Sequence, residues 1–394
     1  MRCGPGALRR CGSLCGAVCC GARMAIEDFI SERARSVKES GIRRIFNLAA
    51  SLKDPINFSI GQPDFEVPEP AKQAAIEAIR AGHNGYTVTQ GLPALREKIA
   101  ARVAHYYNGT PEILVTSGLS GGLLLALMVT VNAGDEVLYP DPYFVSYPNL
   151  VQCAGGKPVA VSTYPDFQLS PDKIAEAITP KTKILLLNSP NNPTGVVYTA
   201  EQIQQVCTLA EKHDLLIISD EIYRDLSYDG PTPSPAEFVP ERTILLRGFS
   251  KSYSMTGWRM GYASGPQAIL QQMGNMQQYT FVCAPSMAQH GAIAALDVDM
   301  SEQVGNYSRK RDLVMQELGS HFEYARPHGG FYFFLKVPAR FENSTQFVEA
   351  ALDKNLLCVP GAAFSRQDTH FRISYATADG DIRRGCDVLR SMAG

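Results

Sequence analysis

The sequence predicts an α/β protein with a large domain built on a mostly parallel seven-stranded sheet, beside a smaller α+β domain. Through the middle of the chain, short apolar runs typical of buried strands alternate with segments of helical spacing. Because helical crossovers cover both faces of a parallel sheet, this alternation favours parallel strands between two helical layers. After Asp297 a long charged helical segment and aromatic strands follow instead, which predicts the second domain.

Local patterns give the expected elements. Apolar residues recur every three or four positions from Met24 to about Lys53, which predicts an N-terminal helix. Further helices are expected at residues 70–81, within 91–107, and at 121–131, 142–153, 200–213 and 301–318. The seven strands of the large domain are expected at residues 112–116, 136–139, 158–161, 183–187, 215–219, 243–247 and 261–263. Residues 329–334 and 371–374 supply strands of the smaller domain.

With 394 residues, of which 45% are hydrophobic, the chain can bury the cores of two domains. We expect the large domain at residues 61–297 and the smaller one at residues 24–60 together with 298–394. Residues 1–23 stand apart, with five cysteines, four arginines and no acidic residue. A transit peptide, a metal-binding tail or translation from a start codon upstream of Met24 would each explain them. A transit peptide has more serine and an amphipathic stripe, so we favour the last and expect a disordered tail or one foreign to the natural protein.

The composition excludes several classes of protein. Lys plus Arg total 37 and Asp plus Glu 39, so the chain lacks the positive excess of a nucleic-acid binder. No apolar run has the length of a membrane span. The seven histidines show no metal-ligand spacing, and no metal site is predicted. The five cysteines outside the tail are typical of reduced thiols. We expect a cytoplasmic enzyme that acts on small molecules.

Lys251 is the most informative residue of the chain. It lies in residues 248–259 (GFSKSYSMTGWR), after the apolar run 244–246 and eight positions before Arg259. A lysine that forms a Schiff base needs a cramped, partly dry site, which lowers its pKa toward neutrality. Taken alone, a lysine among serines is more often a surface residue. Two upstream features, an aspartate at a strand end and an Asn-Pro-Thr-Gly turn, favour a pyridoxal phosphate site instead.

These two features follow neighbouring strands. Asp220 ends the apolar run 215–219, and ligands of open α/β sheets bind outside the carboxyl ends of the strands. A pyridoxal ring needs an anion beside its nitrogen, although Asp220 alone would also suit a helix N-cap. Tyr223 can donate its phenol to the ring oxygen. Asn192, in the turn at residues 188–195 (NSPNNPTG), can bond both cofactor and substrate.

A phosphate site is expected where residues 117–122 (SGLSGG) join a strand to a helix. Small residues there leave backbone N–H groups free at a helix N-terminus, which suits an anion, although an isolated Gly-rich loop is a weak signal. Arg259 supplies a guanidinium, which binds phosphate through two parallel hydrogen bonds. Phe144 is placed to stack on the ring; helix core is an equally good interpretation of it.

Several motifs together resemble the class I/II aminotransferases of the fold-type I pyridoxal phosphate family. They are residues 61–65 (GQPDF), 191–195 (NNPTG), 219–223 (SDEIY), 249–261 (FSKSYSMTGWRMG) and 371–376 (FRISYA). The resemblance runs from about Ile26 to the C-terminus. Residues 41–49 (GIRRIFNLA) further resemble the aspartate and aromatic aminotransferase branch.

The resemblance implies a role for each matching position. Lys251 is the Schiff-base lysine and proton shuttle, Asp220 pairs with the ring nitrogen, and Tyr223 and Asn192 hold the ring oxygen. Arg372 binds the substrate α-carboxylate, helped by Asn192 and the backbone of Gly61. Phe144 stacks on the ring. The phosphate is expected among Leu119, Ser120, Gly121, Ser250 and Arg259. Tyr86 matches a tyrosine that reaches the neighbouring subunit's phosphate, which implies a homodimer with shared active sites.

Two positions depart from the family. Gly248 stands where many relatives have a serine that contacts the phosphate. Ser120 stands where some aspartate-specific relatives have a lysine for the distal carboxylate, so an acidic preference is in doubt unless Arg43, Arg44 or a partner residue supplies the charge.

We therefore predict a ping-pong aminotransferase that acts on α-amino acids and 2-oxo acids, with 2-oxoglutarate as the expected acceptor. A pyridoxal phosphate β-lyase of the same fold is the alternative enzyme. A pyridoxal-binding transcription regulator would need a DNA-binding segment before the fold, and the 23-residue tail is too short for one.

Overall fold

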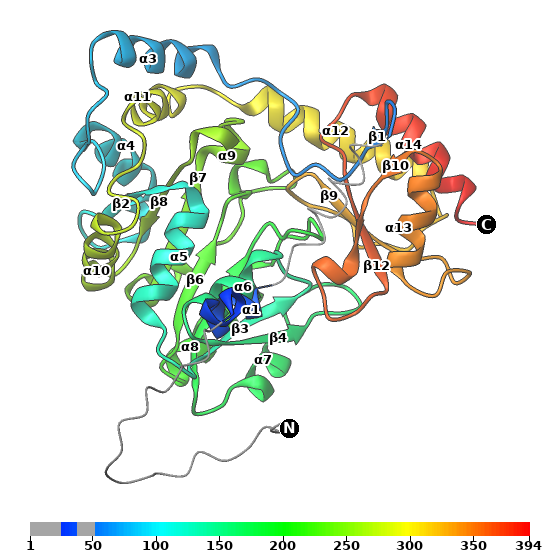
Figure 1. The fold of residues 1–394 in the computed structure, drawn as a ribbon, viewed down its shortest axis with the longest axis horizontal. Helices are drawn as coiled ribbons and strands as arrows, with labels where there is room; N and C mark the ends of the chain where they lie inside the picture. The colour runs from blue at the N-terminus through cyan, green and yellow to red at the C-terminus, as the bar shows by residue number, and fades with distance from the viewer. Residues whose placement is uncertain (1–24, 38–51) are drawn as a thin grey trace, which may run out of the picture.

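The computed structural model describes residues 25–37 and 52–394, which form a large unit and a smaller one side by side (Figure 1). The large unit is built on a seven-stranded sheet with the order β2-β8-β7-β6-β5-β3-β4, in which β8 is antiparallel to both of its neighbours and the other pairs are parallel. The prediction of a mostly parallel seven-stranded sheet is confirmed. Its strands are β2 (Ile113–Ser117), β3 (Glu136–Asp141), β4 (Lys157–Ser162), β5 (Thr182–Asn188), β6 (Leu216–Asp220), β7 (Thr243–Gly248) and β8 (Met260–Ser264).

Helices cover both faces of this sheet because its central strands are apolar on both sides. In β5, Ile184 and Leu186 belong to the core cluster that contains residues of α5 and α10. Leu185 and Leu187 belong to the cluster that contains residues of α8, as the two-residue period of a strand requires. The helices of the large unit are α3 (Glu69–Arg80), α4 (Pro93–Val103), α5 (Gly118–Thr130), α6 (Ser146–Cys153), α7 (Pro171–Ala177), α8 (Ala200–Lys212), α9 (Phe249–Ser252), α10 (Gln267–Gln278) and α11 (Ser286–Ala295).

The smaller unit has its own aromatic core around an antiparallel sheet with the order β11-β12-β9. A two-residue parallel pairing joins β1, before the large unit, to β10, after it. The elements are β1 (Ile56–Asn57), α12 (Ser301–Leu318), β9 (Tyr332–Lys336), α13 (Ser344–Asp353), β10 (Leu356–Leu357), β11 (Val359–Pro360), β12 (His370–Ser374) and α14 (Asp379–Ser391). The domain boundaries at residues 60/61 and 297/298 stay a prediction.

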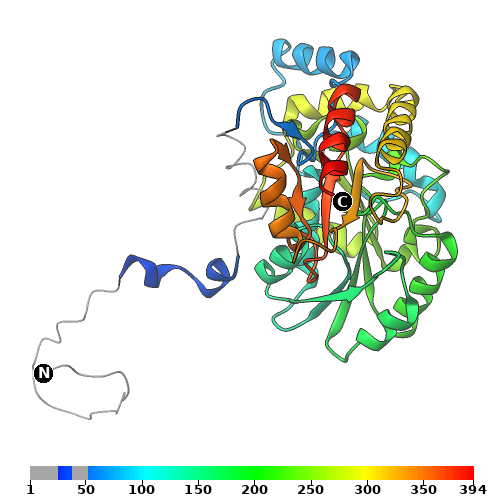
Figure 2. The same cartoon turned by 90° about the vertical axis from the view of Figure 1, so that its right-hand side faces the viewer.

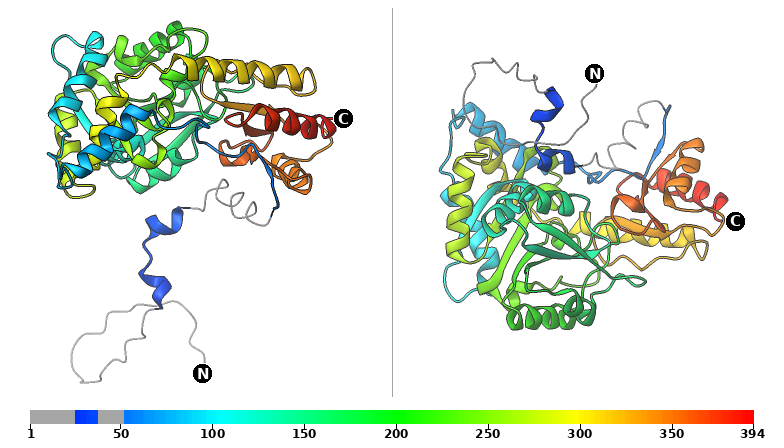
Figure 3. Two further views of the ribbon diagram at one scale, coloured as in Figure 1. Left: turned by 90° about the horizontal axis from the view of Figure 1, so that it is seen from above. Right: turned by 60° about the horizontal axis from the view of Figure 1, so that its bottom comes forward.

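The predicted N-terminal helix is not continuous. A 3-10 turn at Ile26–Phe29 and the short helix α1 (Glu32–Ser36) are separated by extended backbone at Ile30, and residues 38–51 lie outside the described part of the chain. Figures 2 and 3 show this segment at the outside of the large unit, and its helix α1 lies next to α6. Ile26 and Phe29 are 78% and 69% exposed, so the described chain covers little of either side chain, and such short helices are marginal alone.

The helix expected at residues 142–153 begins only at Ser146. The Tyr143 N–H donates to the carbonyl of Phe364 in the smaller unit (2.8 Å), which holds the preceding segment out of the helix. Phe144 is therefore in the connection between β3 and α6, not in a helix core. Within the described residues, none of the helices is both long and apolar enough to cross a lipid bilayer.

Candidate active site

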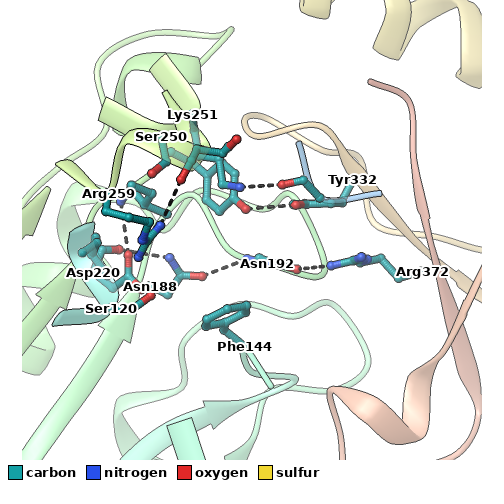
Figure 4. Close-up of a pocket in the computed structure, with 15 residues that line it drawn as sticks. Ser120, Phe144, Asn188, Asn192, Asp220, Ser250, Lys251, Arg259, Tyr332 and Arg372 are labelled. Carbon is teal, nitrogen blue, oxygen red and sulfur yellow. Dashed lines mark hydrogen bonds between the residues drawn. The ribbon is translucent and has the colours of Figure 1, made fainter. Parts of the chain in front are cut away.

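A cavity of about 250 Å³ opens where the carboxyl ends of β5, β6 and β7 face the smaller unit. Figure 4 shows side chains from both units converging on it. Eleven predicted site residues line it: Gly61, Leu119, Ser120, Phe144, Asn192, Asp220, Tyr223, Ser250, Lys251, Arg259 and Arg372. Two predicted residues do not: Gly121 is buried in the next position of α5, and Tyr86 is 86% exposed on an outer loop. The residues that motif reasoning missed are Asn188, Ile222, Thr256 and Tyr332.

Lys251 lies on the four-residue helix α9, directly after β7. Its amine is inside the cavity and donates to the Gly61 carbonyl, so the surface interpretation does not hold. Burial lowers the pKa of this amine to about 8, and the charges of Arg372 and Arg259 act in the same direction. A buried amine with a depressed pKa has the properties of a lysine nucleophile.

Asp220 is the last residue of β6 and is buried. One carboxylate oxygen accepts the Tyr147 hydroxyl (2.7 Å), and the other accepts the N–H of Ile222 (3.2 Å). The following 3-10 helix has Tyr223 as its N-cap, so Asp220 does not cap it. Burial raises the pKa of Asp220 to about 6, and the Tyr147 hydrogen bond opposes this rise. Tyr147 lies 73 positions away in sequence and had no local signal to reveal it.

The turn that carries Asn192 is tied to the end of β6. The side chain of Asn188 accepts the N–H of Asn192 (2.9 Å) and donates to the carbonyl of Asp220 (3.0 Å). Asn192 uses its amide oxygen to accept from Arg372 (3.1 Å), which leaves its NH₂ group as a donor toward the cavity. Adjacent strand ends therefore place an amide donor and a carboxylate on the same cavity.

Arg372 on β12 is a fully buried cation. Its guanidinium lies between the rings of Tyr332 and Phe364, 4.4 and 4.6 Å from their centroids. It donates to Asn192 and to the carbonyl of Ser59 (2.9 Å), while its Nε has no hydrogen-bond partner among the described residues. Burial lowers its pKa, and the described part of the chain gives it no acidic partner. A buried charge of this kind is costly unless an anion joins it.

The first turn of α5 and Arg259 form a second anion-binding feature. Leu119 and Ser120 lie in the first turn of α5 and line the cavity, and the backbone N–H groups of a first helical turn have no partner within the helix. Arg259 has left-handed backbone geometry (φ 56°) and donates to the Thr256 carbonyl (3.1 Å). A Cβ atom on Gly118 would collide with the Arg259 guanidinium, so glycine at this position is what lets the cation lie over the helix start.

A comparison with protein families identifies the chain. The family described as "Aminotransferase class I and II" matches residues 53–389. The chain belongs to the class I and II aminotransferase family. It is 38% identical over 376 residues to the probable aspartate aminotransferase of Methanocaldococcus jannaschii, covering 92% of this chain and 99% of that relative. It is 36% identical to aromatic-amino-acid aminotransferase 2 of Thermococcus litoralis, with 92% and 98% covered.

Solved structures agree with this assignment. A single mutant of Thermus thermophilus aspartate aminotransferase has a TM-score of 0.88 at 34% identity, covering 92% of this chain and 99% of that one. The fold-type I architecture, the reaction class and the cofactor follow: this aminotransferase depends on pyridoxal phosphate. The side chains fit the group, because the cavity offers a buried amine for its aldehyde, a buried carboxylate for its ring nitrogen, and a helix start with an arginine for its phosphate.

Proposed function

We propose that this aminotransferase moves the amino group of an α-amino acid to 2-oxoglutarate in two half-reactions, with both substrates held by Arg372. The observation that carries the proposal is the buried Arg372 guanidinium, which lacks an acidic partner in the described chain and shares a cavity with Lys251 and Asp220. A carboxylate that entered the cavity would supply the missing anion, and α-amino acids and 2-oxo acids both carry one.

The predicted site residues that line the cavity each have a task in this proposal. Pyridoxal phosphate, when bound, withdraws electrons from the substrate Cα. Lys251 anchors the cofactor, and its amine, with a pKa of about 8, is released to carry the proton from Cα. Asp220 holds the proton on the ring nitrogen. Tyr223 and the free NH₂ group of Asn192 donate to the ring oxygen.

The remaining predicted residues surround the ring, the phosphate and the substrate. Phe144 covers one face of the ring from its place in the β3–α6 connection. Leu119 and Ser120 surround the phosphate with Ser250 and Arg259, while Gly121, the next residue of α5, contributes only its backbone N–H at the helix start. Gly61 lies beside the substrate.

The amino donor is proposed to be broad, with neutral and aromatic side chains competing with aspartate. The cations that line the described cavity are Lys251, Arg259 and Arg372, and each already has a role. Ser120 adds no charge for a distal carboxylate. Arg43 and Arg44, in the segment 41–49 that resembles the aspartate and aromatic branch, lie outside the described residues. The named relatives include both aspartate and aromatic aminotransferases.

We also propose a cytoplasmic homodimer in which Tyr86 completes the partner's site. Tyr86 is 86% exposed, yet its loop is held in place: the Gln289 amide donates to the Thr87 hydroxyl (2.9 Å), and the Gln277 amide donates to the Thr89 carbonyl (2.7 Å). A rigid loop that presents an exposed tyrosine is suited to contact a second chain.

A single-turnover experiment tests the reaction. The cofactor-loaded enzyme is mixed with one amino acid at a time, without an acceptor. Transfer predicts one 2-oxo acid and one pyridoxamine phosphate per active site, followed by a stop that 2-oxoglutarate relieves. A β-lyase, the alternative of the same fold, would release ammonia, keep its cofactor in the aldehyde form and continue to turn over.

A further inference from the structure

Tyr332 lines the cavity but has no task in the roles proposed above. Figure 4 shows Tyr332 among the side chains that line the cavity. It is the first residue of β9 and is 1% exposed. Its hydroxyl lies 3.0 Å from the hydroxyl of Tyr223, and its ring lies against the guanidinium of Arg372. One side chain thus touches both the residue proposed to hold the ring oxygen and the residue proposed to hold the substrate carboxylate.

The hydrogen-bond chemistry of the two phenols determines which hydroxyl donates to the other. Each hydroxyl is buried, and among the described residues each has the other as its one hydrogen-bond partner. A phenol has a single O–H to donate. If Tyr223 donates its O–H to the ring oxygen of the cofactor, its own oxygen can only accept. Tyr332 is then the donor within hydrogen-bond distance.

We propose that Tyr332 is a positioning residue that donates to Tyr223, so that Tyr223 in turn donates to the ring oxygen. This rests on the proposed role of Tyr223. A chain of hydrogen bonds in a low-dielectric site polarises its members, so the bond from Tyr223 to an anionic ring oxygen becomes stronger. Tyr332 therefore stabilises negative charge on that oxygen without touching it.

The ring of Tyr332 has a separate effect. With Phe364 on the other face, it holds the Arg372 guanidinium flat, and an aromatic face attracts a cation. The Phe variant keeps this ring and loses only the hydroxyl, so the two effects can be measured apart.

The test is a pH titration of the absorbance of bound cofactor in resting enzyme. A weaker hydrogen bond to the ring oxygen makes that oxygen more basic, so its titration midpoint rises. Tyr223→Phe raises the midpoint most. Tyr332→Phe raises it by up to about half a pH unit, the size expected when cooperativity is lost from one charge-assisted bond. The double variant has the midpoint of Tyr223→Phe alone, because Tyr332 acts only through Tyr223.

Two controls keep the result interpretable. Tyr375→Phe removes a buried hydroxyl that bonds Tyr228 and the Gly330 carbonyl (both 3.1 Å) outside the cavity, and it leaves the midpoint unchanged. Tyr332→Leu removes the ring as well and raises KM for amino acid and oxo acid, whereas Tyr332→Phe leaves KM near the wild-type value. Circular dichroism and retained cofactor confirm that each variant is folded.

The outcomes separate this inference from the function on which it rests. If wild-type enzyme binds no cofactor through Lys251 or transfers no amino group, the proposed function fails. If wild-type enzyme works but Tyr332→Phe keeps the wild-type midpoint, or its shift persists in the Tyr223→Phe background, the positioning role of Tyr332 is wrong.

Discussion

Replacing Arg372 by methionine should separate function from stability. The side chain is buried, lacks an acidic partner in the described chain, and leaves Nε without a hydrogen bond. Loss of one partner of a buried, hydrogen-bonded charge pair costs roughly 2–5 kcal/mol. If the substrate carboxylate is the other partner, kcat/KM for an amino acid falls roughly 30- to 5,000-fold.

The same change should leave the fold intact. Methionine has a similar length but no charge, and replacement of a buried charge by an apolar side chain is often neutral or stabilising. The variant also loses the hydrogen bonds to Asn192 and to the Ser59 carbonyl, which lowers its stability. The two effects oppose each other, so we expect the free energy of unfolding to change by less than about 2 kcal/mol.

Phenylalanine and phenethylamine, which differ by the carboxylate, provide the assay. The wild-type enzyme should strongly prefer phenylalanine, and Arg372→Met should lose most of this preference because phenethylamine never used the guanidinium. Arg309→Gln is the matched control and should behave as wild type. It removes a half-exposed cation that is paired with Asp379 on the outside of α12. Activity of Arg372→Met toward phenylalanine within tenfold of wild type, with unchanged preference, would refute the reasoning.

Three further predictions concern charge, assembly and donor. Asp220→Asn should slow Cα proton removal by orders of magnitude. Burial raises the pKa of Asp220 from 3.8 to about 6, so the folded protein loses stability as the pH rises from about 4 to 6. At pH 8 the cofactor-free Asp220→Asn variant should therefore be up to about 3 kcal/mol more stable than the cofactor-free wild type. Denaturant titrations measure this difference in the free energy of unfolding, which should vanish below about pH 4. Tyr86→Phe should weaken cofactor retention. Mixing it with Lys251→Ala should restore activity above the sum of the two, because each hybrid dimer contains one intact site; an active monomer by sedimentation would contradict this. Ser120 predicts kcat/KM for aspartate less than about a hundredfold above that for alanine or phenylalanine, and a larger ratio would mean that another cation binds the distal carboxylate.

The sequence predicted the parts of the site that follow strand ends. Asp220 and the turn of Asn192 were found because an apolar run shows where a parallel strand stops, and such ends share one edge of the sheet. Tyr332 and Tyr147 were missed because their partners lie 109 and 73 positions away, and a tyrosine in an aromatic strand or helix has no local feature that marks it.

The two errors in the elements have a related cause. Apolar spacing after Met24 indicates a face that needs cover, but it does not say whether the chain provides that cover. The exposure of Ile26 and Phe29 shows that the described chain covers little of these two side chains. Residues 142–145 were assigned to a helix on local pattern alone. Their conformation depends on a hydrogen bond from Tyr143 to Phe364 across more than half of the chain.

We infer that Lys251 carries the cofactor covalently. Its amine lies in the cavity beside Gly61, with a pKa lowered to about 8 by burial. Borohydride reduction of the cofactor-loaded enzyme, followed by digestion and peptide mass spectrometry, tests it most directly. We expect a pyridoxyl group on Lys251 in the peptide that spans residues 248–259. A pyridoxyl group on another lysine, or none on any lysine, would contradict it.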